Sequence, residues 1–408
     1  MNMTYTAGSR MRSRVFFYAG TGILAVKVLL MYSAIFQIPE TLDNILVILG
    51  VTCLLTKIIF QQYTWKAFLR CAVLGGFTCI CTVRSRDYAL LFTMLVICAF
   101  QDISIDAFVR MLYRIQIGYL WIHGLLYAIR LFLRPELLSF NWRDDFIRHA
   151  VGMSHANIFS MIVTWMILEW LYLNYEKIGF RALVGMQILG IAVYALAFSR
   201  TSLVVLTMTL VLAGLSKWKE KLGRLFLTVS RWIYPILTAL SLFIMRFYFD
   251  IPGIAGQAVR VFNRASSGRL NMWGTAYQLY GASLWGQTIV GNGKVAWNEV
   301  YRVTQIIVDN TYVYFAIKCG GIFLIVFGIV YFQLRKGEKI KQALMVIAFS
   351  VFNSMESFGG SIFLCFPLCF IGYGLYENLG RKREDEKEGT KEGAGTPADY
   401  GSGDKLYG

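Results

Sequence analysis

The chain has 408 residues, of which 57% are hydrophobic and only 16% are charged, and its mean hydropathy is +0.54. This composition excludes a soluble domain with a polar exterior. The net charge of +16 is spread over short basic clusters between apolar runs rather than held in one basic domain. We therefore interpret it as a determinant of membrane topology and expect no nucleic-acid partner.

Apolar runs long enough to cross a bilayer recur along most of the chain. A span needs about 20 mostly apolar residues, because each backbone N–H and C=O must be bonded inside the helix. The pattern predicts an all-α, polytopic membrane domain of about 12 transmembrane helices over residues 1–379. The expected spans are 15–36, 42–60, 67–83, 87–101, 115–133, 157–174, 182–198, 201–215, 228–249, 309–333, 342–355 and 360–378.

The ends of the chain have distinct patterns. Arg10, Arg12 and Arg14 precede the first apolar run, and no small-residue cleavage site follows it, which predicts a retained first span. The tail over 380–408 is charged, rich in glycine and nearly free of large aliphatic residues. Such a segment cannot bury enough surface to order itself, so we expect it to be disordered.

Basic residues fix the expected orientation, because lysine and arginine resist translocation. The loops 177–181, 217–224 and 335–341 are basic, as are the N-terminus and the start of the tail. With twelve spans and both termini in the cytoplasm, all five of these basic segments lie on the cytoplasmic side. Arg84 and Arg86 then fall on the outer side, which a re-entrant fourth segment would explain.

Three segments share the outer face in this scheme: 134–156, the turn at 199–200 and the stretch 250–308. The last has roughly 60 residues, whereas most connections have about 4 to 6. We therefore expect an extracytoplasmic loop that folds and carries function. All eight cysteines lie in or beside apolar runs, which predicts neither a disulfide framework nor a metal site.

Within the long loop, the sequence Ser267-Gly268-Arg269 predicts the start of a helix, with Ser267 as the expected N-cap. Backbone donors at a helix N-terminus and a guanidinium together bind phosphate oxygens well. Trp273 follows on the same face. The alternative is that Arg269 is solvated and Trp273 is an interfacial anchor.

Polar side chains also mark the other outer segments. Arg200 lies between two apolar runs and could form a diphosphate clamp with Arg269, although a snorkelling arginine is common at such a position. His155 and Asn157 precede a span, and His155 could transfer a proton or act only as a polar cap. Asp309 begins the sequence Asp-Asn-Thr-Tyr at the start of another span, where an ordinary N-cap is the simpler interpretation.

Nucleotide chemistry has no support in the outer segments. The sequence Gly-Asn-Gly-Lys at 291–294 lacks the spacing of a Walker A loop and has no following serine or threonine. No Asp-x-Asp pair of the type that holds a metal with a nucleotide sugar occurs in an outer segment. An outward-facing enzyme would need a donor that does not come from the cytosolic nucleotide pool, and we expect no cofactor.

The succession of these motifs resembles the O-antigen ligase and Wzy-type polysaccharide polymerase superfamily. It consists of 152–157 before a span, Ser-Arg at 199–200, Ser-Gly-Arg at 267–269 with a following tryptophan, Gly-Asn-Gly at 291–293 and Asp-Asn-Thr-Tyr at 309–312. The resemblance covers about residues 150 to 330, and each motif is short. It implies a metal-independent glycosyltransferase of the GT-C type in the bacterial inner membrane, which uses undecaprenyl-diphosphate-linked glycans.

The resemblance also implies roles for individual residues. Arg269 and Arg200 would bind the donor diphosphate and stabilise the charge that develops on the leaving group. His155 or Asp309 would activate the acceptor hydroxyl. The remaining candidates would contact substrate, with the aromatic rings stacked on sugar faces: Trp273, Tyr277 and Tyr312, together with Ser267, Asn310 and Asn157.

The resulting hypothesis is a polymerase of lipid-linked repeat units in capsular polysaccharide, exopolysaccharide or O-antigen synthesis, with membrane lipid and a chain-length regulator as candidate partners. Residues 250–308 contain no histidine, unlike the large loop of the family's ligases, which favours a polymerase. The alternatives are an O-antigen-ligase-like transferase to a lipid or protein acceptor, a flippase or transporter of lipid-linked glycans, and a membrane protein without catalysis.

Overall fold

The computed structural model of the chain describes residues 7–133, 140–143, 146–289, 294–298, 303–305, 308–333 and 339–376. Helices dominate it, and the strands form two antiparallel hairpins, β1–β2 and β3–β4. The elements are α1 (Ala7–Met31), α2 (Glu40–Ile59), α3 (Trp65–Ser85), α4 (Tyr88–Cys98), α5 (Ile105–Leu133), β1 (Phe140–Arg143), β2 (Phe146–His149), α6 (Ala156–Asn174), α7 (Phe180–Ala197), α8 (Arg200–Trp218), α9 (Glu220–Phe247), α10 (Gly253–Ala265), α11 (Arg269–Tyr280), β3 (Lys294–Asn298), β4 (Val303–Gln305), α12 (Thr311–Tyr314), the π-helix η2 (Phe315–Cys319), α13 (Gly321–Gln333), α14 (Ile340–Asn353) and the 3₁₀ turns η4 (Phe358–Gly360) and η5 (Phe366–Leu368).

Eight helices among the described residues are long and apolar enough to cross a membrane, judged by length and composition. They are α1, α2, α3 and α5 to α9. The other four expected spans coincide with shorter apolar helices, at Tyr88–Cys98, Gly321–Tyr331, Ile340–Asn353 and Phe366–Tyr376. The 11 residues of α4 rise only about 16 Å, roughly half of a hydrocarbon core.

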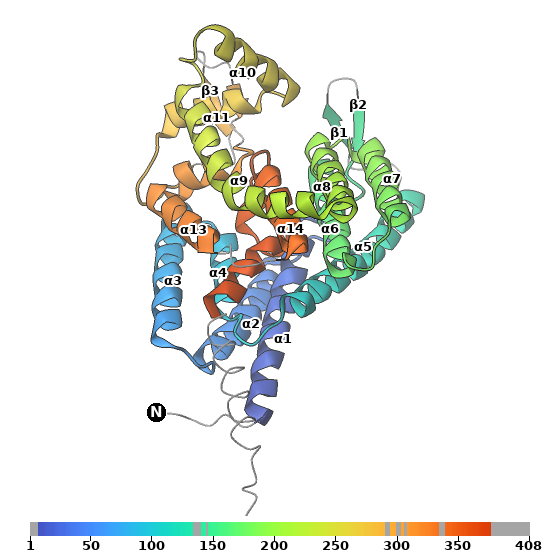
Figure 1. Ribbon diagram of the computed structural model, residues 1–408, viewed down its shortest axis with the longest axis vertical. Coiled ribbons are helices and arrows are strands. Elements are labelled where there is room, and N and C mark those ends of the chain that lie inside the picture. Colours follow the sequence, from blue (N-terminus) through green and yellow to red (C-terminus); the bar gives the residue numbers. More distant parts are fainter. Residues whose placement is uncertain are drawn as a thin grey trace, which may run out of the picture.

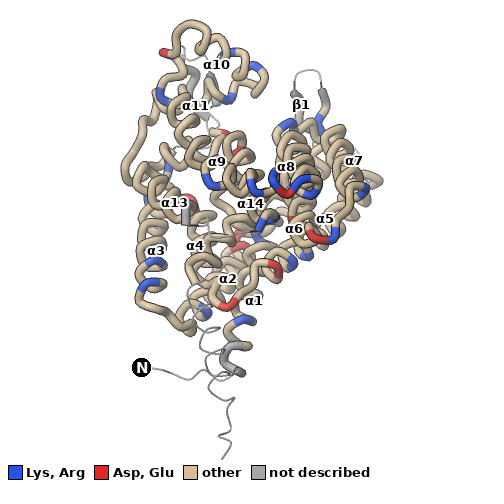
Figure 2. Tube along the Cα trace, viewed as in Figure 1, with Lys and Arg blue, Asp and Glu red and all other residues tan. Residues whose placement is uncertain are grey.

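The outer surface of the helices is apolar. Large aliphatic side chains are exposed on helices throughout the chain: Ile48, Val83, Ile188, Val204 and Ile236. Figure 2 shows that most of the helical trace carries uncharged residues. A soluble monomer in water would not expose so much apolar surface.

Helix α5 begins earlier than the expected start at residue 115. Its first residue is Ile105, and the Ser104 hydroxyl accepts a hydrogen bond from the Ala107 amide at 3.1 Å. Arg110 and Arg114 lie in the added turns. A count of apolar residues ends at these arginines, whereas the helix continues through them because serine caps it further upstream.

Helix α6 lies in the core of the helical assembly. Trp165 is almost completely buried and makes edge-on contacts with the rings of Phe352 and Phe366, which come from α14 and η5. Glu169, one turn further along α6, accepts a hydrogen bond from Gln116 of α5 at 3.0 Å. The C-terminal part of the described chain thus packs around α6.

Helices α1 and α2 approach each other closely at two glycines. A Cβ atom added to Gly20 would lie 2.8 Å from the carbonyl oxygen of Gly50, which is too close for any side chain. We expect Gly20→Val to lower the free energy of unfolding by about 1–3 kcal/mol, because the helices must separate. Thermal unfolding in detergent measures this effect. Gly75→Val on α3 is the control, since nothing lies within 4 Å of Gly75, and equal losses in both variants would contradict the packing argument.

The β1–β2 hairpin and the α10–α11 segment lie at one end of the long axis of the molecule, and the N-terminus lies at the other (Figure 1). Within the expected loop 250–308, the described residues form α10, α11 and the β3–β4 hairpin. The sequence therefore folds there, as its length indicates. The Gly-Asn-Gly motif at 291–293 and the expected disordered tail at 380–408 lie outside the described residues.

Candidate functional site

Helix α11 presents Arg269 as its first residue, directly after a tight turn. The N-cap is Gly268, with a φ of 81°, and not the expected Ser267, which lies in the turn with a φ of 63°. Gly268 adopts this left-handed conformation without steric cost, and its amide donates to the Asn263 carbonyl at 2.8 Å. The turn reverses the chain from α10 into α11, and the first side chain of α11 is Arg269.

Arg269 forms the centre of a buried ion-pair cluster. Its guanidinium lies 2.9 Å from Glu356 Oε1 and 3.5 Å from Asp309 Oδ2. It also donates to the backbone carbonyl of Met355 and, at 3.4 Å, to the hydroxyl of Thr201. The exposed fractions of the Arg269, Asp309 and Glu356 side chains are 16%, 27% and 6%. Two separately predicted candidates, Arg269 and Asp309, thus lie together, with a second carboxylate that the sequence motifs did not include.

Hydrogen bonds at the start of α12 hold both carboxylates in place. Asn310 caps this helix by accepting from the Val313 amide, and its own amide donates to the Ser354 carbonyl at 2.8 Å. The hydroxyl of Thr311 donates to the Glu356 carbonyl at 2.8 Å. Asn310 therefore acts as a structural clamp between α12 and the segment after α14. This clamp brings Glu356 to Arg269.

The electrostatics of the cluster follow from burial. Burial raises the pKa of Glu356 to about 7, against the opposing attraction of Arg269. Burial likewise raises the pKa of Asp309. Burial alone would lower the pKa of Arg269, but the two carboxylates raise it above its usual value. Near neutral pH the cluster thus holds a permanent cation beside an acid that can gain or lose a proton, as acid–base catalysis requires.

Arg200 lies beside the cluster at the start of α8. One of its guanidinium nitrogens donates to the Ala265 carbonyl at 3.2 Å, so it contacts the end of α10, four residues before Arg269. The following residue, Thr201, contacts Arg269 itself. The two arginines that the sequence singled out are therefore neighbours in space, although 69 positions separate them in the chain.

His155 and Asn157 lie at the start of α6. His155 is the N-cap of this helix, and its Nδ1 accepts from the Asn157 amide at 3.1 Å. The Asn157 side chain accepts from Arg148, whose Nε donates to the Ala197 carbonyl at 2.8 Å. Arg148 thereby joins the start of α6 to the end of α7, three residues before Arg200.

Arg148 is a residue that the sequence motifs missed. It is only 5% exposed, and its loss would leave the Ala197 carbonyl oxygen and the side-chain oxygen of Asn157 without this donor. We expect Arg148→Ala to destabilise the protein by about 1–3 kcal/mol, measured by thermal unfolding in detergent. Arg181→Ala is the control, because Arg181 is exposed on α7. An unchanged transition in Arg148→Ala would show that the bridge carries no stability.

Two of the three aromatic candidates are buried. Tyr312 has no exposed surface, its hydroxyl donates to the Ser350 carbonyl, and its ring packs edge-on against Tyr234. Trp273 is 2% exposed and belongs to a small apolar cluster with Leu270. Neither ring offers an open face to a sugar in this structure. The third, Tyr277, is half-buried under the guanidinium of Arg246 at 5.4 Å.

The cluster could bind an anion and exchange a proton. In the described part of the chain, no three His, Cys, Asp or Glu side chains converge to hold a metal. No protein-family model matches the chain, and no curated protein or solved structure matches it. The chemistry of this site is therefore argued from its own residues.

Proposed function

We propose that the chain is a multi-pass membrane glycosyltransferase of the bacterial inner membrane that polymerises oligosaccharide repeat units carried on undecaprenyl diphosphate. One observation carries this proposal: Arg269 contacts Asp309 and also Thr201, the residue that follows the Ser-Arg motif, so three of the short motifs on which the family resemblance rests lie close together. Residues that act on one substrate must converge in space, whatever their separation in sequence.

The membrane part of the proposal rests on the eight long apolar helices and their apolar exterior. In the proposed orientation both termini are cytoplasmic, and the start of α8, the α10–α11 segment and the start of α12 face the outside. Lipid-linked glycans would reach Arg200 and Arg269 there without any nucleotide donor.

The proposed reaction transfers the growing glycan to a second lipid-linked unit. An acceptor hydroxyl oxygen bonds to the anomeric carbon of the donor, and the bond from that carbon to the diphosphate oxygen breaks. The leaving lipid diphosphate keeps the electron pair, and Arg269 and Arg200 stabilise its charge. The hydroxyl proton passes to Asp309 or Glu356, or to His155 at the neighbouring helix start.

A bound diphosphate would compete for the guanidinium of Arg269. In the free protein two carboxylates occupy it, at 2.9 and 3.5 Å. As phosphate oxygens take over these N–H groups, the Glu356 or Asp309 carboxylate becomes available to accept the proton of the acceptor. The same contacts would therefore hold the empty site together and couple donor binding to base formation.

Reconstitution tests the proposal. The purified protein in lipid vesicles is supplied with lipid-diphosphate-linked repeat units, and the products are resolved on a gel stained for glycan. A polymerase gives a ladder of lengthened chains on the carrier lipid. Transfer of an unlengthened glycan to another acceptor would indicate a ligase, movement across the bilayer without a new bond would indicate a flippase, and unchanged substrate would contradict all three.

A further inference from the structure

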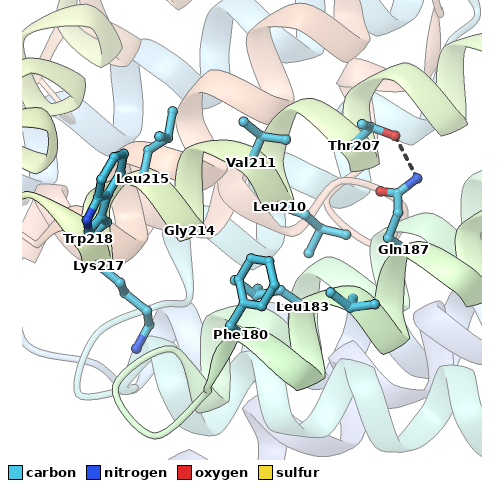
Figure 3. A pocket seen from close by; sticks show the side chains of 11 residues that line it. Phe180, Leu183, Gln187, Thr207, Leu210, Val211, Gly214, Leu215, Lys217 and Trp218 are labelled. Carbon is cyan, nitrogen blue, oxygen red and sulfur yellow. Dashed lines mark hydrogen bonds between the residues drawn. The ribbon is translucent and has the colours of Figure 1, made fainter.

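Helices α7 and α8 enclose an apolar groove with a volume of about 630 Å³. Phe180 and Leu183 line it from α7, and Leu210 and Val211 line it from α8 (Figure 3). Val184 of α7 also lines it. The volume lies within the range of about 300–1,000 Å³ that is typical of sites for small ligands. Phe180 and Val211 are strongly exposed, so the groove opens on the outer surface of the two helices.

The two neutral polar residues that line the groove, Gln187 and Thr207, are hydrogen-bonded to each other. Gln187 donates to the hydroxyl of Thr207 at 3.0 Å, and this pair lies at one end of the groove (Figure 3). The lining between this pair and Lys217 is aliphatic, with Gly214 as the smallest residue. A hydrocarbon chain fits such a lining, because it needs no hydrogen bond.

The opposite end of the groove is basic. Lys217 lines it directly, and Lys217 also donates to the Glu176 carbonyl at 3.5 Å, which uses one of its three ammonium donors. Trp218 is 74% exposed and lies under the ammonium of Lys219, a position typical of the membrane interface. The flanking segments 176–181 and 217–224 hold six basic residues against two acidic ones: Lys177, Arg181, Lys217, Lys219, Lys221 and Arg224 against Glu176 and Glu220.

The basic end lies far from the candidate catalytic site. Arg200 begins α8, and Lys217 is 17 residues further along the same helix, a rise of about 26 Å. This distance approaches the hydrocarbon thickness of about 30 Å. A headgroup at Lys217 would therefore face the opposite membrane surface from Arg200 and Arg269. The groove itself begins near Thr207 and covers the half of α8 nearest Lys217.

We propose that this groove is a binding site for an anionic phospholipid. One acyl chain lies between α7 and α8, and the headgroup phosphate contacts Lys217 and the surrounding basic residues. The charge of the rim selects an anionic lipid, and basic pockets between apolar helices commonly bind such headgroups. The diphosphate donor is a poor occupant, because its own charged group is needed at the other end of α8. The inference goes beyond the proposed reaction, and only the exclusion of the diphosphate donor rests on that proposal.

Thermal unfolding of the detergent-purified protein, titrated with dioleoyl phosphatidylglycerol or dioleoyl phosphatidylcholine, tests the proposal. We expect phosphatidylglycerol to raise the transition temperature in a saturable manner and phosphatidylcholine to raise it far less. Lys217→Gln should weaken the phosphatidylglycerol effect about fivefold in half-saturating concentration. Its control is Lys66→Gln, an exposed lysine at the start of α3.

Filling the groove provides a test that does not change its charge. A Cβ atom added to Gly214 lies 3.7 Å from Leu183, which is an ordinary van der Waals contact. The Cβ atom of Gly214→Leu is therefore tolerated, and the rest of the leucine side chain occupies the groove. We expect this variant to lose the saturable response, whereas Gly76→Leu, with nothing within 4 Å of the added atom, keeps it. Equal responses in both leucine variants, or an equal response to both lipids, would overturn the proposal. Displacement of phosphatidylglycerol by undecaprenyl phosphate at lower concentration would overturn it in favour of the carrier lipid.

Discussion

Arg269→Gln is expected to abolish the long-chain ladder, with a fall in transfer rate on the order of 10²–10³. The guanidinium is the buried cation of the cluster, and glutamine cannot stabilise the charge on a leaving diphosphate. The same change removes the partner of Glu356 and Asp309, which costs about 3–5 kcal/mol for a buried ion pair. Polymer length in cells and thermal unfolding in detergent measure the two effects.

A second substitution separates catalysis from stability. In the double variant Arg269→Gln/Glu356→Gln, a neutral glutamine replaces the buried carboxylate that lost its partner. We therefore expect most of the lost stability to return. Transfer should remain absent, because no cation has returned. Arg264→Gln is the matched control, since Arg264 is exposed on α10, five residues before Arg269. A normal ladder in a stably folded Arg269→Gln variant would remove Arg269 from the reaction.

Glu356→Gln is expected to flatten the dependence of stability on pH. Burial raises the pKa of Glu356 from its usual value near 4.5 to about 7, so the folded protein binds this proton more tightly than the unfolded chain. The resulting stabilisation is fully present below about pH 4.5 and is lost as pH rises through about 7. It amounts to about 3 kcal/mol.

The measurement is the thermal transition in detergent between pH 5 and 8.5. The wild type should become less stable as pH rises through 7, and Glu356→Gln should show a smaller decline. Glu220→Gln serves as the control, because Glu220 pairs with Arg224 on the surface, where its side chain is 77% exposed. An unchanged slope in Glu356→Gln would show that this carboxylate does not titrate in the folded protein.

Much of the helical architecture could be predicted from hydropathy, because apolar runs report burial or lipid contact directly. The helices α2, α6, α7 and α8 begin within two residues of their expected starts, at Glu40, Ala156, Phe180 and Arg200. The expected span 309–333 instead divides at the π-helix Phe315–Cys319 before α13. Hydropathy alone does not locate this break, because four of the five residues of the π-helix are themselves apolar.

The candidate site could be predicted only in part. Arg269, Arg200 and Asp309 are polar residues at the ends of apolar runs, and that local signal identified them. Glu356 lies at the end of such a run as well, but its role depends on a contact 87 residues back along the chain, which no local pattern contains. Arg148 gave no signal because a basic residue in an expected outer segment is usually solvated.

The separation between Arg269 and Glu356 also orders the events of biosynthesis. The hydrogen bond between them closes a loop of 87 residues, so Glu356 leaves the ribosome long after α11 has been translated. A nascent chain that ends before α14 holds Arg269 without this partner and without the Met355 carbonyl. Thr201 and Arg200 can hold the α10–α11 segment before this point, but only residues 355 and 356 complete the cluster around Arg269. A chain truncated before residue 355 would therefore present quality-control proteases with an open cluster.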